Sequence, residues 1–404
     1  MNRVPKLRFK EFCGEWEEKK LGEISSNIMY GLNSSAVEFD GENKYIRITD
    51  INEINGKFEP NPLTSPSGTL DDNFLVNEND ILFARTGASV GKTYHYNIKD
   101  GKLYFAGFLI RFHINKANSK FIYYNTLKED YNKWVALTSM RTGQPGINAE
   151  EYKNYKIKLP CLEEQEKIAD FLSSVDKKIS TTEEKLGLFK DYKKGIMQKI
   201  FNQELRFKDS NGNDYPEWEE KKLGEISSNI MYGLNSSAVE FDGENKYIRI
   251  TDINEDNGKF EPNPLTSPSG TLDNNFLVNE NDILFARTGA SVGKTYHYNI
   301  KDEKLYFAGF LIRFHINKAN SKFIYYNTLK EDYNKWVALT SMRTGQPGIN
   351  AEEYKNYKIK LPCLEEQQKI ANFLSSIDNK IDNLTSELED LKEFKKGLLQ
   401  QMFV

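Results

Sequence analysis

The chain has 404 residues, enough for two or three domains that each bury a hydrophobic core. Its formal net charge is -4, so the overall charge gives no indication of nucleic-acid binding. A protein that is acidic overall can still carry a local positive face. Three cysteines are too few for a disulfide framework, which fits a reducing compartment. The N-terminus lacks the apolar core of a signal peptide, and no run approaches the ~18 apolar residues of a membrane helix. We therefore expect a soluble cytoplasmic protein.

The residues before the first long helix mix strand and helix patterns, which predicts an α/β (α+β) domain. Residues 44–51 alternate and are rich in β-branched side chains, as in a strand. Asn55 and Gly56 have turn chemistry, and the proline-rich residues 60–68 have the composition of a loop. Ser119 is predicted to cap a helix that runs to about residue 135. Further strands are predicted at residues 80–85, 92–97, 103–114 and 155–159.

Residues 162–201 place apolar side chains at alternating steps of four and three, the heptad spacing of a coiled-coil helix. Only Thr182 and Lys193 interrupt this seam. The helix would be roughly 60 Å long, and one helix alone cannot bury such an apolar stripe. The seam residues predicted to pack in this helix are Ile168, Leu172, Val175, Ile179, Leu186 and Phe189.

The chain is an internal duplication. The sequence from Glu15 recurs 202 residues later, from Glu217, and a second heptad run in the same register closes the chain. This period is too long for a solenoid and indicates two copies of a domain-plus-helix unit. In the globular part the differing pairs are Ile54 and Asp256, Asp72 and Asn274, and Gly101 and Glu303. The seam residues of the second helix are Ile370, Leu374, Ile377, Ile381, Leu388 and Leu391.

Connectivity predicts how the two helices pair. The second globular stretch begins near Pro216, almost directly after the first helix ends. A parallel partner would require that stretch to carry the chain back roughly 60 Å, whereas an antiparallel partner starts where the first helix stops. We therefore expect an antiparallel coiled coil and a pseudo-twofold internal repeat. The predicted domains are a first globular domain at 1–158, a spacer helix at 159–203, a second globular domain at 204–360 and a second spacer helix at 361–404.

Polar loops are the candidate binding sites. The glycine loop at residues 87–93 can present donors to phosphates or base edges, and residues 141–146 offer Arg and Gln, which read guanine and adenine. Residues 30–35 add amide and hydroxyl groups. The candidates in the first copy are Asn33, Ser34, Arg47, Arg85, Thr86, Ser89, Lys92, Arg141 and Gln144. Those in the second are Asn235, Ser236, Arg249, Arg287, Thr288, Ser291, Lys294, Arg343 and Gln346.

Catalytic chemistry finds little support in the sequence. The glycine loop has three residues between its first glycine and Gly-Lys, where a nucleotide-binding P-loop needs four. The histidines lie in predicted strands without a metal-binding frame, so we expect hydrogen-bonded strand residues, no metal site and no catalytic residue. One alternative class stays open at this point: a noncatalytic coiled-coil adaptor for other proteins, with two ligand-binding heads.

Three segments resemble the specificity subunit of type I restriction–modification systems. They are Trp-Glu-Glu-Lys-Lys-Leu-Gly-Glu-Ile near the start of each copy, Asp-Ile-Leu-Phe-Ala-Arg-Thr-Gly-Ala-Ser-Val-Gly-Lys, and the Leu-Pro-Cys-Leu-Glu-Glu-Gln entry to each long helix. The resemblance covers essentially the whole chain. It implies two target-recognition domains, each reading a short DNA half-site, and two helices that set the gap between half-sites.

The resemblance also implies partners. Two methyltransferase subunits would bring S-adenosylmethionine and flip an adenine for N6-methylation, and endonuclease subunits using ATP and Mg would join them. This chain itself would be noncatalytic and carry no cofactor. Family members usually carry two different recognition domains, whereas these two are nearly identical. We therefore expect a split inverted-repeat target with a nonspecific spacer.

Overall fold

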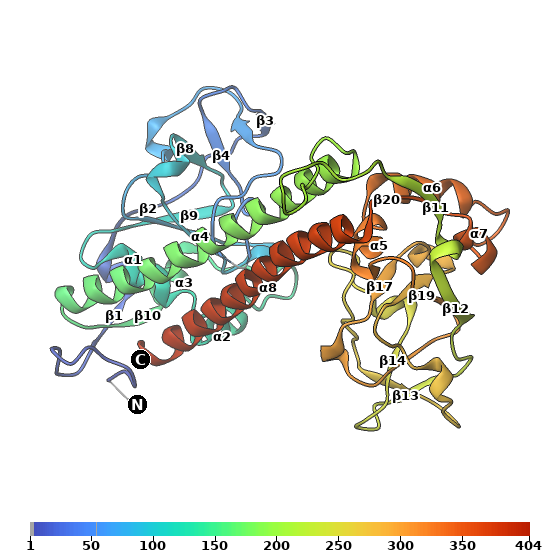
Figure 1. Cartoon of the computed structure of the whole chain (residues 1–404). Coiled ribbons are helices and arrows are strands. Elements are labelled where there is room, and N and C mark those ends of the chain that lie inside the picture. Colours follow the sequence, from blue (N-terminus) through green and yellow to red (C-terminus); the bar gives the residue numbers. More distant parts are fainter. Residues whose placement is uncertain (1–3, 54) are drawn as a thin grey trace. The chain divides into compact units, whose positions relative to one another are not determined.

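The computed structural model describes residues 4–53 and 55–404, so Ile54 lies outside the described residues. The chain divides into two units (Figure 1). Unit 1 comprises Met1–Glu184 and Thr385–Val404, and unit 2 comprises Lys185–Leu384. Each unit therefore contains one globular domain and parts of both long helices.

In its described part, unit 1 contains the strands β1 to β10, the short α-helices α1 to α3, the first part of α4 and the last part of α8. Its strands are β1 (Glu17–Lys20), β2 (Ser25–Tyr30), β3 (Ala36–Glu38), β4 (Lys44–Ile46), β5 (Thr64–Pro66), β6 (Asp80–Ala84), β7 (Thr93–His95), β8 (Leu103–Phe105), β9 (Leu109–Ile114) and β10 (Lys156–Leu159). Its helices are α1 (Ser119–Asn125), α2 (Glu129–Thr138) and α3 (Ala149–Lys153); α4 spans Leu162–Phe201 and α8 spans Leu364–Gln401.

A four-stranded antiparallel sheet in the order β2-β9-β6-β7 is the centre of unit 1. Alternate residues of its strands point to opposite faces. Ile81 and Phe83 of β6 join the core beneath the helices, while Leu82 and Ala84 join a second core with β4 and β8. The sheet is thus covered on both faces, and its strand ends are free to carry loops.

Unit 2 repeats this architecture with the order β12-β19-β16-β17 in its central sheet. Its strands are β11 (Glu219–Lys222), β12 (Ser227–Tyr232), β13 (Ala238–Glu240), β14 (Lys246–Ile248), β15 (Thr266–Pro268), β16 (Asp282–Ala286), β17 (Thr295–His297), β18 (Leu305–Phe307), β19 (Leu311–Ile316) and β20 (Lys358–Leu361). Its short helices are α5 (Ser321–Asn327), α6 (Glu331–Thr340) and α7 (Ala351–Lys355).

The two long helices pair in an antiparallel sense. In unit 1 the first half of α4 packs against the last part of α8, and in unit 2 the last half of α4 packs against the first half of α8. The chain end after α8 reaches the globular domain of unit 1 (Figure 1). There Phe403 packs on Trp16 and Phe121. Every predicted seam residue of both helices is buried or half-buried.

Several predicted elements differ from the structure for local physical reasons. The predicted helix from Ser119 to residue 135 is two helices, α1 and α2, and its cap is Asn118, whose side chain accepts from the Phe121 N–H. The predicted strand 103–114 is broken between β8 and β9. The predicted strand 44–51 stops at Ile46, because the Asp50 carboxylate accepts from the Arg47 N–H and closes a turn.

The proline-rich residues 60–68 are not wholly a loop, because β5 within them pairs with β3. The turn at Asn55 and Gly56 and the strand before α4 are present as predicted. Helix α4 spans the residues of the predicted heptad run, 162–201. None of the helices within residues 4–53 and 55–404 combines the length and apolar character that crossing a bilayer requires.

Candidate nucleic-acid interface

Three loops meet at one end of the central sheet in unit 1. In the antiparallel ladder, Ala84 at the end of β6 pairs with Leu109 at the start of β9, and Tyr30 at the end of β2 pairs with Ile110. The residues that follow β2, follow β6 and precede β9 therefore come together. The Gly107 N–H donates to the Leu32 carbonyl at 2.9 Å, which fastens two of these loops to each other.

The loop at residues 141–146 docks onto the loop after β6. The Gly87 N–H donates to the Pro145 carbonyl at 3.0 Å, and the Ile147 N–H donates to the Arg85 carbonyl at 2.9 Å. Thr86 and Gly146 form an isolated β-bridge. Two loops that are about fifty residues apart in the sequence thus form one surface, which we call the loop cluster: residues 30–34, 85–92, 107–108 and 141–146.

Arg85 is the central cation of the loop cluster. Its guanidinium lies 5.0 Å from the ring centroid of Tyr30 and 5.6 Å from that of Phe108, and its Nε donates to the Gly107 carbonyl at 3.1 Å. Tyr30 and Phe108 are 41% and 56% exposed, so both rings face solvent on this surface. Within the described residues Arg85 forms no ion pair with a carboxylate. Its charge is therefore available to an incoming anion or base edge.

The other predicted cations are held by carboxylates. Arg47 makes a two-pronged contact with buried Asp50, at 2.9 Å and 2.8 Å. The Arg141 Nη2 donates to both carboxylate oxygens of Glu151, and its Nη1 donates to two carbonyls at the end of α2. Lys92 lies 3.8 Å from the carboxylate of Glu53. These side chains shape the loops, and each would have to leave its partner to contact a ligand directly.

The predicted polar side chains lie in the loop cluster. Asn33 is exposed, while the Ser34 hydroxyl donates to the Ser67 carbonyl at 2.6 Å and holds its loop. Thr86 and Ser89 are half-buried in the loop after β6. Exposed Gln144 supplies an amide beside them.

Gly87 and Gly31 explain why these loops need glycine. Gly87 has a φ of +69°, and a Cβ there would approach the Gln144 Nε2 at 2.9 Å. A Cβ at Gly31 would lie 2.3 Å from the Ala106 carbonyl oxygen. At Gly87 the positive φ is the constraint, because the Gln144 side chain could move aside, whereas a side chain at Gly31 would push the backbone of residues 105–106 away.

The same surface is repeated in unit 2 with nearly the same dimensions. The Arg287 guanidinium lies 5.0 Å from the Tyr232 ring centroid and 5.7 Å from the Phe310 ring centroid. The Ile349 N–H donates to the Arg287 carbonyl at 2.9 Å, as in unit 1. Arg249 is bound by Asp252, Arg343 by Glu353 and Lys294 by Glu255, so the cations divide in the same way. Asn235, Ser236, Thr288, Ser291 and Gln346 occupy the equivalent loops.

Sequence reasoning missed the two exposed aromatic rings, Tyr30 and Phe108. Phe108 was hidden because the predicted strand 103–114 ran straight through it. The Ala-Gly pair before it was the available signal, since a glycine inside an apolar strand pattern marks a break. Tyr30 begins the segment 30–35 that the sequence singled out, but it is the last residue of β2, and the sequence gave no sign that its ring would be exposed.

Two further buried charges of unit 1, Asp80 of β6 and Arg111 of β9, lie in the central sheet away from the loop cluster. Asp80 is 1% exposed and pairs with the His113 Nδ1 at 2.9 Å, and burial raises the pKa of this carboxyl. Arg111 donates to the carbonyls of Asn73 and Leu75 at 2.9 Å each. These contacts hold the loop between β5 and β6 in place. They account for the histidine of β9 as a hydrogen-bonded strand residue.

Among residues 4–53 and 55–404, no group of three or more His, Cys, Asp or Glu side chains could hold a metal ion. The glycine loop makes a single short turn, Gly87–Ser89, and leads into strand β7, whereas a P-loop opens a helix on the phosphates. This loop is therefore not a nucleotide-binding P-loop.

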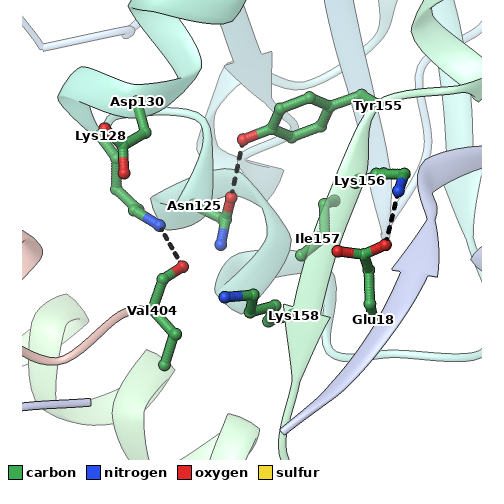
Figure 2. A pocket seen from close by; sticks show the side chains of 9 residues that line it. All are labelled: Glu18, Asn125, Lys128, Asp130, Tyr155, Lys156, Ile157, Lys158 and Val404. Atoms are coloured by element: carbon green, nitrogen blue, oxygen red, sulfur yellow. Dashed lines mark hydrogen bonds and ion pairs between the residues drawn. The ribbon is translucent and has the colours of Figure 1, made fainter. Parts of the chain in front are cut away.

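A hollow in unit 1 lies among β10, β1 and the start of α2 (Figure 2). Several of its polar groups pair with one another: the Lys128 Nζ donates to the Val404 carbonyl at 3.0 Å, and Lys156 pairs with Glu18 at 2.8 Å. The Tyr155 hydroxyl donates to Asn125 at 3.1 Å. The hollow thus anchors the segment after α8 and is separate from the loop cluster.

Comparison with known proteins identifies a family and relatives with a similar sequence. The family model described as Type I restriction modification DNA specificity domain matches residues 14–187 and 215–393. The chain is 30% identical to the MjaVIII specificity subunit of Methanocaldococcus jannaschii, over 97% of this chain and 94% of that protein. It is 22% identical to the StySPI specificity subunit of Salmonella potsdam, over 87% of this chain and 81% of that protein.

Among solved structures, the S subunit of a type I restriction–modification system from M. genitalium matches with a TM-score of 0.65 at 16% identity. The match covers 99% of both chains, so the fold is shared from end to end. The family domain occurs twice, on the two halves that the internal repeat defines. The chain therefore belongs to the family of type I restriction–modification DNA specificity subunits.

Proposed function

We propose that this chain reads a split DNA target made of two equal half-sites in inverted orientation, separated by a nonspecific spacer. Each loop cluster would contact one half-site. Arg85, with Tyr30 and Phe108 beside it, would meet the DNA in one domain, and Arg287 would do so in the other.

The near-identity of the two loop clusters carries this proposal. The guanidinium-to-ring distances in unit 1 and unit 2 agree to within 0.1 Å, and the same loops hold them. The globular differences lie away from these rings: Asp72 and Asn274 each accept a tyrosine hydroxyl, and Gly101 and Glu303 each follow a short turn after β7 or β17. Two surfaces with the same groups in the same places would select the same bases.

The inverted orientation is supported by the helix pairing. The start of α4 packs in the core of unit 1, the start of α8 packs in the same way in the core of unit 2, and the two helices run antiparallel. The units therefore exchange the roles of the two helices. Two such units reading opposite strands would match the dyad of an inverted repeat.

We also propose the partners and chemistry that the family implies. Specificity subunits recognise DNA and leave catalysis to partners, so N6-methylation of adenine would come from two methyltransferase subunits carrying S-adenosylmethionine. ATP- and Mg-dependent cleavage would come from endonuclease subunits. The assembly would work in the cytoplasm, and this chain would bind no cofactor of its own.

Salt-dependent duplex binding tests the DNA role. For the chain with its methyltransferase partner, the logarithm of the association constant for double-stranded DNA should fall linearly with the logarithm of the salt concentration, because phosphate contacts release counterions. The expected slope is about -0.9 for each phosphate contacted. A coiled-coil adaptor for other proteins would show no such slope, and its absence would overturn the proposal.

A further inference from the structure

One polar position in the seam of each long helix has a specific partner. Lys395 of α8 occupies a seam position in unit 1, and its Nζ lies 2.6 Å from the Asp176 Oδ1 of α4. The two side chains are 18% and 32% exposed, so the pair is largely sheltered from water. Sheltered ion pairs in a coiled-coil seam cost stability when one partner is missing, which makes them selective for register.

A tyrosine of the recognition domain completes this contact. The Tyr124 hydroxyl, from α1, donates to the Asp176 Oδ2 at 2.7 Å, and the Lys395 Nζ lies 5.7 Å from the Tyr124 ring centroid. Tyr124 is only 4% exposed. One carboxylate thus joins three elements: α4, α8 and the globular domain.

Unit 2 contains the same triad with the helices exchanged. The Lys193 Nζ of α4 lies 2.6 Å from the Asp378 Oδ1 of α8, and the Tyr326 hydroxyl donates to the Asp378 Oδ2 at 2.6 Å. The Lys193 Nζ lies 5.4 Å from the Tyr326 ring centroid. The two triads, Lys395–Asp176–Tyr124 and Lys193–Asp378–Tyr326, are here called the seam lock.

A slip of one heptad in either direction would break both triads. In one direction Lys395 would face Ala169 and Lys193 would face Ala371, and both alanines are fully buried. Each ammonium would then lie in an apolar seam without a carboxylate, which is costly.

The opposite slip fails for a different reason. It offers the lysine of α8 a carboxylate at Glu183, but it sets Asp176 against Met402 and Asp378 against Ile200. Both apolar residues are buried. Neither slipped register pairs all four charges.

Parallel pairing is also excluded by the lock. The repeat offset of 202 residues would place Lys193 beside Lys395 and Asp176 beside Asp378 in a parallel pair. Like charges would then meet in the seam, which selects against that arrangement.

We propose that the seam lock fixes the register of α4 on α8, and that it thereby sets the distance between the two recognition domains. The second part rests on the proposed function, because that distance becomes the spacer of the DNA target. The lysines and aspartates are positioning residues: they contact no DNA and act by holding the domains that do.

Distances between spin labels on the full chain test the register directly. The labels go on exposed cysteines replacing Glu184 and Gln400, with Cys13, Cys161 and Cys363 changed to serine. The labelled sites are offset along the helix axis by about 20 Å, and a one-heptad slip of about 10 Å changes that offset by about half. A single distance is expected for the otherwise unchanged chain.

The test variant carries Lys193→Met and Lys395→Met, which keep side-chain length and remove both ammonium groups. A second distance population is expected. The matched control carries Lys178→Met and Lys392→Met, whose ion pairs with Glu387 and Glu183 also bridge α4 and α8 but are far more exposed. The control should keep the single distance.

A charge-reversed chain covers the case in which the test variant does not fold. It carries Lys193→Asp with Asp378→Lys and Lys395→Asp with Asp176→Lys, and it should restore a single distance. If the double-methionine chain folds and keeps the single native distance, or if the folded reversed chain shows slipped registers, the lock is refuted.

Duplexes of different spacer length separate the two parts of the proposal. The double-methionine chain should lose its preference for the native spacer over one about three base pairs longer. Loss of register with unchanged spacer preference would keep the lock and refute its role in spacing. Failure of the unchanged chain to bind any duplex would count against the proposed function and leave the distance result standing.

Discussion

The sequence predicts the same role, contact with DNA, for several arginines, but in the folded chain only some of them lack a carboxylate partner among the described residues. Arg85 is held between two exposed rings without a carboxylate partner among the described residues, whereas Arg141 is bound by Glu151. The sequence predicted a strand at residues 80–85 from a short apolar run, and β6 ends one residue before Arg85, at Ala84. It could not show that Glu151, in the next short helix, would neutralise Arg141.

Replacing Arg85 and Arg287 with alanine removes one guanidinium from each loop cluster. Specific binding of the cognate duplex should weaken by about 1–3 kcal/mol per half-site, the usual cost of losing a base-contacting arginine. Titration with the cognate duplex measures this. The matched control, Lys99→Ala with Lys301→Ala, removes the same charge near the opposite end of the sheet and should leave affinity almost unchanged; equal affinity for both variants would remove Arg85 from the interface.

The histidine of β7 makes stability depend on pH. Burial, with Lys120 nearby, lowers the pKa of His95 from 6.5 to about 4, and the same holds for His297. The unfolded chain therefore takes up these protons at higher pH than the folded chain, so stability should fall as pH drops from about 6.5 toward 4. Thermal melts at pH 7 and pH 5 should show a smaller loss in a His95→Gln, His297→Gln chain, and an equal loss would contradict this assignment.

At the level of elements, the long helices were the most predictable part of the fold. The heptad run predicted α4 correctly, because a pattern forty residues long remains clear despite a few polar exceptions. The short strands were less predictable: β3 and β5 are three residues each and gain their pairing from tertiary context. The docking of residues 141–146 on the loop after β6 is a long-range contact, and no local pattern encodes it.

The seam should carry much of the stability of each unit. Leu172 of α4 is fully buried in the core of unit 1. Leu172→Ala should therefore lower the free energy of unfolding by about 2–5 kcal/mol, through lost burial and a cavity. Leu188→Ala, on the same helix but 62% exposed, should change it by less than about 0.5 kcal/mol. Chemical denaturation of the two variants measures the contrast, and similar losses would mean that the seam is not the stabilising face.

For the whole molecule, we propose that the helix pair acts as a ruler between two equal recognition domains. The internal repeat made the two-domain plan predictable, since near-identical sequences fold alike. In the proposed ruler, register would set the spacing between the domains, and heptads alone leave register ambiguous by one or more repeats.

Inserting one heptad after Glu184 and one after Leu384 lengthens both helices between the two units. Each insertion adds roughly 10 Å, so the preferred spacer should grow by about three base pairs. Methylation assays on duplexes with graded spacers measure this. An unchanged spacer would show that the helices do not set the distance.

The central claim is that two equal recognition domains read one half-site twice, in inverted orientation. Genome-wide mapping of N6-methyladenine in a host that expresses this chain with its methyltransferase partner tests it most directly. We predict a single bipartite motif whose halves are reverse complements across a fixed nonspecific gap. Two unrelated half-sites, or a direct repeat, would contradict the account.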